Sequence, residues 1–193
     1  MTHQRIARQT RGFTLTEAAI VLGIVGLILG AIWVAAASVY ANLRVKQTSE
    51  QLIQIAQAIR ALHATNTTIP AATTMIQLAR AGAIPKDMLN DATNPTIVTN
   101  IWGGVMTASD VRTTVGAAGD GFVITFPAVP QQACVDLAVR NSGQGRDAGL
   151  VGIANAAATT TAFPLSTADA IAICGNTTAV GNTLAFTFRL RAG

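Results

Sequence analysis

Few residues in this sequence have the type and spacing to do chemistry, and Glu17 is the first of them. It lies near the start of "RGFTLTEAAIVLGIVGLILGAIW", residues 11 to 33, and no charged residue occurs from Ala18 to Leu43. A charge at membrane depth costs on the order of 2.5–3.5 kcal/mol on insertion scales. The cost falls when an opposite charge lies nearby in a low dielectric. We therefore expect Glu17 to have a positive partner.

Cys134 and Cys174 are the second set, and they favour one disulfide over a metal site. Neither belongs to a CxxC pair, and only His3 and His63 could join them as soft ligands. A zinc site would need closer pairs. An even number of cysteines in a chain with a membrane-targeting start favours oxidation, which would add about 3 to 4 kcal/mol in the chain-entropy account. Two unpaired buried thiols are the alternative.

No other group of residues has the spacing of a catalytic site. The aspartates are scattered, and "DATN" at 91 to 94 lacks the ligand spacing of a calcium loop. The sequence has no phosphate-binding glycine motif followed by Lys and Ser or Thr. His63 falls just before the end of a helical stretch, where a surface position is expected. We therefore expect no enzyme activity, no metal and no cofactor.

Composition favours a protein with a membrane segment. Half of the residues are hydrophobic, only 11% are charged, and the mean hydropathy is positive. The net charge of +4 is misleading, because Arg5, Arg8 and Arg11 supply three of the thirteen basic residues. Without residues 1 to 12, ten basic residues face nine acidic ones. Since no basic stripe with interleaved aromatics remains, we expect no nucleic-acid partner.

One long helix must position Glu17. A spanning helix needs about 20 mostly apolar residues, and the run that ends at Leu43 is long enough. An apolar stripe then continues at helical spacing through Leu52, Ile55, Ile59 and Leu62. We predict one helix of about 50 residues, roughly 75 Å long. Its transmembrane half covers 13–43 and its amphipathic half covers 44–64.

The flanking charges predict the orientation of this helix. Basic flanks stay in the cytoplasm, so residues 1 to 11 face inward and everything after Arg44 faces outward. Both cysteines then lie where oxidation is possible.

Three glycines, Gly23, Gly26 and Gly30, lie within the apolar run, and the last two form a GxxxG spacing. Small residues let helices approach closely in lipid, although each glycine weakens a helix by roughly 1 kcal/mol relative to Ala. We favour close helix packing over local unwinding. Glycines are also common in membrane helices without any such role.

The start of the chain resembles a known signal. An ordinary secretory signal has its small-residue cleavage site after the apolar run, whereas Gly12 comes before it. "RGFTLTE" resembles the prepilin signal of type IV pilins and pseudopilins. The resemblance implies that a membrane aspartyl peptidase cuts between Gly12 and Phe13 and methylates the new amine. It also implies that Glu17 meets the Phe13 amine of an adjacent subunit in a filament. The alternative is that Glu17 faces its own amine or the lipid head groups, as an acid favoured at a helix N-terminus.

The remainder, 65–193, is predicted to be a globular α/β head. We expect short helices near residues 72 to 81, at "QQACVDLAVRN" and at "STADAIAICG", the last capped by Ser166 or Thr167. "IVTNIWGGVMT" and "GFVITFPAV" are interpreted as strands. "NTLAFTFRL" predicts a half-buried antiparallel strand whose apolar face packs on the long helix. That face consists of Leu184, Phe186, Phe188 and Leu190.

The head adds to the resemblance. A pair of cysteines that bounds a variable region, here 134–174, resembles the D-region of pilins. "LARAGAIPKDML", "IWGG", "QQACVDLA" and "NTLAFTF" look most like type IVb pilins of thin and conjugative pili. The resemblance implies a pilin fold of the α+β class, with a long N-terminal helix packed on an antiparallel sheet. We expect residues 141 to 165 to be an exposed, partner-facing surface.

The resemblance also implies a function and partners. We expect a major pilin that is held in the bacterial inner membrane with a periplasmic head and then polymerised into an extracellular pilus for adhesion, aggregation or conjugation. Its partners would be identical subunits, the prepilin peptidase, and an assembly platform with an ATPase. A pseudopilin or minor pilin of a secretion system is one alternative. A signal-anchored periplasmic binding protein, which would keep residues 1–12, is another.

Overall fold

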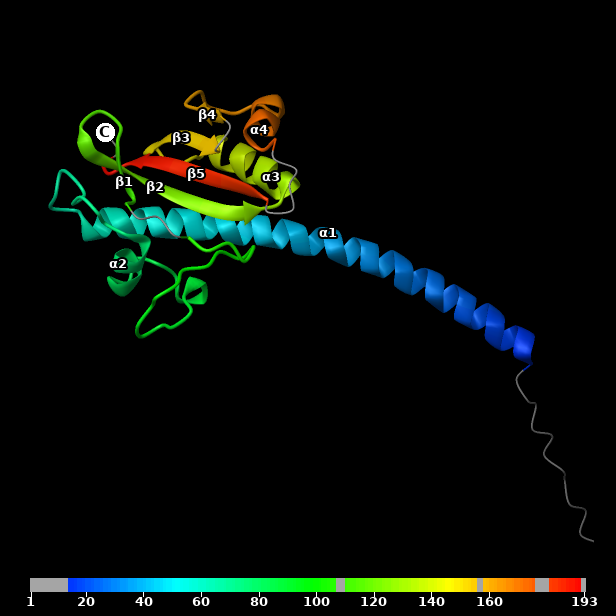
Figure 1. The fold of residues 1–193 in the computed structure, drawn as a ribbon. Coiled ribbons are helices and arrows are strands. Elements are labelled where there is room, and N and C mark those ends of the chain that lie inside the picture. The colour runs from blue at the N-terminus through cyan, green and yellow to red at the C-terminus, as the bar shows by residue number, and fades with distance from the viewer. Residues whose placement is uncertain (1–13, 107–109, 156–157, 176–180, 192–193) are drawn as a thin grey trace, which may run out of the picture. The chain divides into compact units, whose positions relative to one another are not determined.

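The computed structural model describes residues 14–106, 110–155, 158–175 and 181–191. The chain divides into two compact units, Met1–Tyr40 and Ala41–Gly193. Helix α1, Leu15–Leu62, has residues in both units (Figure 1). The prediction of one uninterrupted helix is confirmed from Leu15 onward, but the helix ends at Leu62 rather than at residue 64, and a turn follows.

The second half of α1 forms the centre of the head. Its buried residues recur every three or four positions, as one face of a helix requires, and they are Val45, Thr48, Gln51, Leu52, Ile55, Ala56 and Ile59. Leu62, which the sequence placed in the same stripe, is 44% exposed. It occupies the last position of the helix, where less of the head covers it.

A five-stranded antiparallel sheet packs on this half of α1 (Figure 1). The strand order is β1-β2-β5-β3-β4. The strands are β1 Arg112–Thr114, β2 Ala118–Val129, β3 Leu150–Asn155, β4 Ala158–Thr160 and β5 Asn182–Arg189. Each neighbouring pair is antiparallel, which confirms the predicted fold class.

The C-terminal strand β5 is confirmed with its predicted faces. Leu184, Phe186, Phe188 and Leu190 are at most 4% exposed. Phe188 pairs with Phe122 of β2, and their rings stack with centroids 5.4 Å apart. Because side chains alternate across a strand, this register directs Leu184, Phe186 and Phe188 to the core that contains α1, and Leu190, just beyond the strand, joins them there.

Helices α2 and α4 begin at residues whose side chains cap them, whereas α3 follows Pro130 without a side-chain cap. Helix α2, Met75–Arg80, starts later than predicted because Thr74 caps it, with its Oγ1 accepting the N–H of Gln77 at 3.2 Å. Helix α3, Gln131–Ser142, lies where the sequence placed it. Helix α4, Thr167–Ile173, is capped by Ser166 as expected. A 3-10 turn at Lys86–Met88 completes the helical elements of the described residues.

The prediction of a strand at "IVTNIWGGVMT" is wrong. Over its described residues, 97–106, the segment makes only two isolated bridges, Leu89 with Val98 and Thr99 with Val105. Asn100 ends the extended backbone, because its Oδ1 accepts the N–H groups of Trp102 and Gly104, both at 2.9 Å. A side chain that closes a turn on its own backbone competes with a sheet ladder.

Strands β3 and β4 were not predicted. The expectation of an exposed surface at residues 141 to 165 holds for 144–146 but not for β3, whose residues are buried or half-buried. Leu150 and Ile153 are 3% and 0% exposed. The glycine-rich sequence around them does not predict a strand, because Gly152 and the small residues of β4 show little alternation of apolar and polar side chains. Strand β3 is instead stabilised by its pairing with β5, in which Ile153 lies opposite Phe186.

Candidate functional site

Glu17 lies in the first turn of α1, on an exposed surface. Thr14 precedes the helix, and its side-chain Oγ1 and carbonyl oxygen accept the N–H of Glu17 at 3.4 and 3.1 Å. Thr14 and Glu17 thus have the spacing of a capping box, Thr-x-x-Glu. This spacing is present in the sequence and would have predicted the start of the helix. The threonine satisfies one of the four free N–H groups that begin every helix. A carboxylate in this turn also complements the helix dipole.

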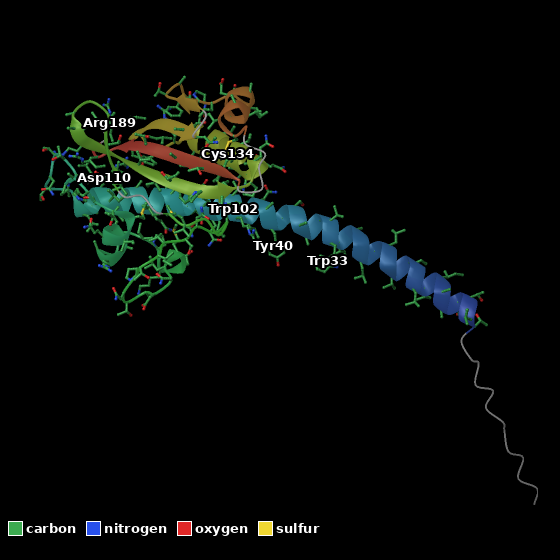
Figure 2. The ribbon with its side chains drawn as sticks, viewed as in Figure 1. Trp33, Tyr40, Trp102, Asp110, Cys134 and Arg189 are labelled. Carbon is green, nitrogen blue, oxygen red and sulfur yellow. A yellow bond between two sulfur atoms is a disulfide. The ribbon has the colours of Figure 1, made fainter. Side chains whose placement is uncertain are left out.

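The apolar half of α1 has no covering within the chain's described residues. Its large side chains are exposed on every side of the helix, since each residue is rotated by about 100° from the last. Leu22, Leu27 and Trp33 are 70%, 76% and 76% exposed, and Figure 2 shows Trp33 and Tyr40 projecting from the helix. By length and composition α1 could cross a membrane, a test that a signal sequence also passes.

The three predicted packing glycines lie on this uncovered helix. No atom comes within 4 Å of a Cβ built on Gly23, Gly26 or Gly30. Nothing in the described chain therefore requires glycine at these positions. The predicted processing residues Gly12 and Phe13 lie outside the described residues.

The predicted disulfide is present in the head. Cys134 in α3 and Cys174 at the end of α4 are bridged, with their Cα atoms 5.8 Å apart and both residues fully buried. Nearby, Asn155 at the end of β3 donates from Nδ2 to the carbonyl oxygen of Ile173 at 2.7 Å. The bridge and this hydrogen bond hold α4 against α3 and the sheet.

Arg60, near the end of α1, holds the loop that follows α3. Its Nη1 and Nη2 donate to the two carboxylate oxygens of Asp147 at 2.7 and 2.8 Å. Its Nε donates to the carbonyl oxygen of Arg189 at 3.2 Å. Its Cζ lies 5.8 and 5.6 Å from the ring centroids of Phe122 and Phe188. Arg60 thus joins the helix, the loop and two strands.

The surroundings of Asp147 keep it charged. The hydrogen bond from Arg60 is the main cause that lowers the pKa of Asp147 below its ordinary 3.8. The N–H of Gly149 and the charge of Arg60 act in the same direction, whereas burial opposes them. A Cβ at Gly149 would overlap the Arg60 guanidinium in its present position, so a larger residue there would require the arginine side chain to shift.

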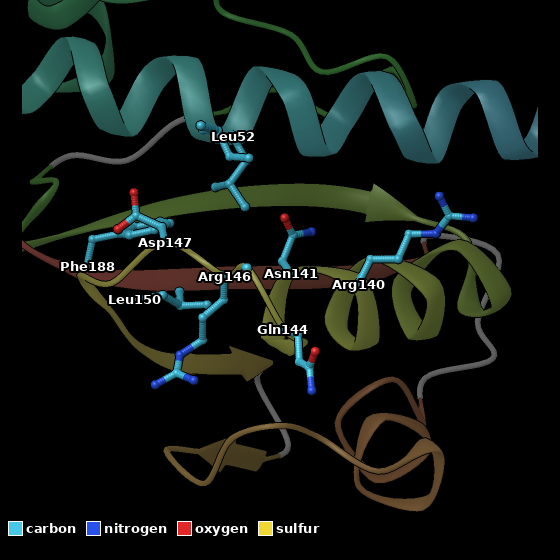
Figure 3. A pocket seen from close by; sticks show the side chains of 10 residues that line it. Leu52, Arg140, Asn141, Gln144, Arg146, Asp147, Leu150 and Phe188 are labelled. Carbon is cyan, nitrogen blue, oxygen red and sulfur yellow. The ribbon is translucent and has the colours of Figure 1, made fainter.

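A small cavity of about 80 Å³ lies beside this ion pair (Figure 3). Leu52, Leu150 and Phe188 form its apolar part, and Arg140 and Arg146 are among the exposed residues that border it. The volume is far below the roughly 300–1,000 Å³ of pockets that bind drug-sized molecules. We assign no ligand to it.

Metal-binding geometry is not found in the described part of the chain. No three residues among its His, Cys, Asp and Glu gather into a possible metal-binding group. The features that stand out are therefore structural: an uncovered apolar helix and a disulfide-braced head.

The head provides the deciding comparison. Residues 42–189 match the PilS N-terminal family. The chain belongs to this family and is a type IVb pilin. The matched residues do not overlap the "RGFTLTE" motif on which the pilin resemblance began, so two separate parts of this pilin lead to the same family.

A solved crystal structure agrees with the assignment. The crystal structure of a type IVb pilin from Salmonella typhi is 27% identical to this pilin, with a TM-score of 0.50, covering 70% of this chain and 94% of the other. An NMR structure of the type IVb pilin PilS from the same organism is 23% identical, with a TM-score of 0.49, covering 75% and 95%. No curated protein matches the chain. Pilins are structural subunits, and the expectation of a non-enzymatic role accords with the family and fold.

Proposed function

We propose that this pilin is the structural subunit of a type IV pilus and polymerises through α1. The observation that carries the proposal is the apolar half of α1, whose large side chains are exposed in the monomer. Apolar surface costs about 25 cal/mol per Å² when it stays in water. A membrane before assembly, and the helices of identical subunits after it, would both remove this cost.

Processing follows from the same proposal. Cleavage between Gly12 and Phe13 would remove the basic leader and keep α1 as the anchor. The mature chain would then have residues 13–43 as its membrane or filament-core segment, 44–64 as the amphipathic half of the helix, and 65–193 as the head. From Leu15 to Tyr40, α1 extends about 39 Å at 1.5 Å per residue, which exceeds the roughly 30 Å hydrocarbon core of a bilayer.

Glu17 has a specific role in this proposal. Its exposed carboxylate would pair with the new amine of Phe13 on a neighbouring subunit and so fix the axial register between the two. The exposed glycines Gly23, Gly26 and Gly30 would let neighbouring helices approach closely. The capping contact between Thr14 and Glu17 uses the glutamate backbone N–H, and this leaves the carboxylate available to a partner.

Substitution of Glu17 tests the assembly role. Glu17→Ala should abolish surface filaments while the leader is still removed, because cleavage depends on the residues around Gly12. Filaments are counted by electron microscopy after shearing, and processing is followed by the mass of the membrane-bound chain. Thr16→Ala, next to Glu17 but without a charge, is the matched control and should assemble normally. Normal filaments from Glu17→Ala would contradict the role.

Abundance separates a major pilin from a pseudopilin or minor pilin of the same superfamily. A major pilin dominates the protein in sheared surface filaments, whereas a pseudopilin remains in a short periplasmic structure. Extraction from the membrane and polymerisation would require a separate assembly platform and ATPase, since this sequence has no phosphate-binding motif.

A further inference from the structure

A polar cleft of about 240 Å³ opens where the segment after α1 meets the β1–β2 hairpin and the end of β5. Its lining residues are Thr67, Gly116, Asp120, Arg189 and Arg191. None of these is aromatic or large and apolar. The charged and hydroxyl side chains among them suit a ligand that offers charges and hydroxyl groups.

The guanidinium groups of Arg189 and Arg191 line this cleft, and neither is engaged in a salt bridge with a carboxylate of the described residues. Arg191 donates from Nη2 to the carbonyl oxygen of Asn66 at 3.3 Å, which uses one of its five N–H donors. A guanidinium group binds a carboxylate with good geometry and charge.

The backbone at these arginines is held in place. The N–H of Arg189 donates to the carbonyl oxygen of Gly149 at 2.7 Å, and its own carbonyl accepts from Arg60. Between the two arginines, Leu190 is 4% exposed and donates its N–H to the carbonyl oxygen of Asp120 at 2.8 Å. Figure 2 shows Arg189 at the end of the strand. Ligand binding would therefore require little ordering of the backbone, which lowers its cost.

Asp120 supplies a fixed acceptor in the same cleft. Its Oδ1 accepts the N–H of Val115, and its Oδ2 accepts the N–H groups of Gly116 and Ala117, each at 2.8 Å. These backbone hydrogen bonds, that of Val115 first, lower the pKa of Asp120. A carboxylate has about four acceptor positions, so about one remains for a ligand hydroxyl.

We propose that this cleft binds a single acidic sugar unit. The sugar carboxylate would accept hydrogen bonds from Arg189 and Arg191, and its hydroxyl groups would contact Asp120 and the hydroxyl of Thr67. A simple anion has no hydroxyl group that could donate a hydrogen bond to Asp120. The volume lies below the roughly 300–1,000 Å³ range of drug-sized pockets, which suits one sugar ring. The proposal does not depend on filament assembly and is tested on the unassembled chain.

The test uses the full-length chain in a non-ionic detergent and follows backbone amide shifts by NMR. Methyl β-D-glucuronide is the probe, and methyl β-D-glucoside, which lacks only the carboxylate, is its control. The glucuronide should shift the amides of Thr67 and Gly116 in a saturable way, and the glucoside should not. Sodium acetate should bind at least about tenfold more weakly than the glucuronide, because it cannot contact Asp120.

Variants locate the binding. Arg189→Gln with Arg191→Gln should weaken glucuronide binding at least about tenfold. Arg80→Gln, which changes an exposed arginine outside the cleft, should leave it unchanged. The amide shift of Trp102 reports whether each variant is folded. Absence of saturable shifts with glucuronide, equal shifts with the glucoside, equal affinity for acetate, or full binding by the folded double variant would each overturn the proposal.

Discussion

Arg60 and Asp147 form the shortest ion pair described in the head, and their side chains are only 20% and 15% exposed. The exposed pair Lys46 and Glu50 on the same helix lies 3.8 Å apart, with side chains 68% and 58% exposed. Exposed pairs contribute little to stability. Removing one partner of a buried, hydrogen-bonded pair costs more, because the other charge is left without compensation.

The first prediction compares these two pairs. Asp147→Ala should lower the free energy of unfolding by about 1.5–3 kcal/mol, since it leaves the Arg60 guanidinium without its bidentate acceptor. Glu50→Ala should change it by about 0.5 kcal/mol or less. Chemical unfolding of the full-length chain in detergent, followed by near-ultraviolet circular dichroism, measures both. Equal losses would show that the Arg60 contact does not stabilise the head.

The second prediction concerns pH. The pKa of Asp147 is lowered in the folded chain, mainly by the hydrogen bond from Arg60, so the unfolded chain binds its proton at higher pH. The stability from this group is therefore fully present above about pH 4 and is lost as the pH falls through the folded pKa.

Asp147→Asn should lose that acid-sensitive component and show a shallower decline in unfolding free energy below about pH 4. Asp120 and Asp110, whose pKa values are also lowered, contribute to the decline in both proteins. The difference between the two slopes therefore isolates Asp147. Parallel slopes would contradict the assignment.

At the scale of elements, close backbone approach decides where several segments lie. A Cβ added to Gly104 would overlap the carbonyl oxygen of Pro127 in β2. The same carbonyl accepts from Nδ2 of Asn100 at 2.6 Å. The turn at residues 100–104 is thereby attached to the end of β2, and it connects the loop region to the sheet.

The third prediction tests that attachment. Gly104→Ala should destabilise the head by at least about 1–3 kcal/mol, the usual cost of overpacking. Gly143→Ala is the matched control, because the nearest atoms to its added Cβ lie at 3.5 and 3.6 Å. It should change stability by about 0.5 kcal/mol or less. Thermal unfolding of the three proteins gives the comparison, and equal transition temperatures would disprove the close approach.

Elements with strong local patterns were predictable from the sequence. The apolar run of α1 predicts a helix and the alternation of β5 predicts a strand. Burial of one face imposes a period of 3.6 residues on a helix and of 2 residues on a strand. Strand β3 carries no such pattern and depends on pairing with β5. The misassigned segment at residues 97 to 107 contains β-branched residues, but Asn100 turns its backbone.

The contacts within the candidate sites were less predictable. The signal residues Gly12, Phe13 and Glu17 and the two cysteines are distinctive in type and position along the chain. Arg60 and Asp147 are not, since they are far apart in sequence and each resembles an ordinary surface residue. No pattern in the sequence predicts that Arg189, Arg191 and Asp120 line the same cleft.

At the scale of the whole molecule, the head is small and is braced by one covalent link. The disulfide joins α3 to α4 across a sequence separation of 40 residues. The core of the head is built from one side of α1 and the inner face of the sheet. Disulfides of this kind persist in oxidising compartments, which accords with the extracellular pilus that the pilin family suggests.

The fourth prediction concerns this link. Replacing both cysteines, Cys134→Ser with Cys174→Ser, should lower the free energy of unfolding by more than about 3–4 kcal/mol, because loss of the link costs about that much and two hydroxyl groups are buried as well. Cys134→Ala with Cys174→Ala separates loss of the link from burial of two hydroxyl groups and should lose less than the serine variant. An alanine variant as stable as the unchanged chain, measured by denaturant unfolding, would show that the bridge does not stabilise the head.

The central claim is that a glutamate is kept at membrane depth because a newly exposed amine on a neighbouring subunit compensates it. That amine exists only if the chain is cut before Phe13. Intact-mass and N-terminal fragment spectra of protein from sheared surface filaments measure this directly. The account predicts a chain that begins at Phe13 and carries one methyl group on its amine. Filaments made of chains that still begin at Met1 would contradict it.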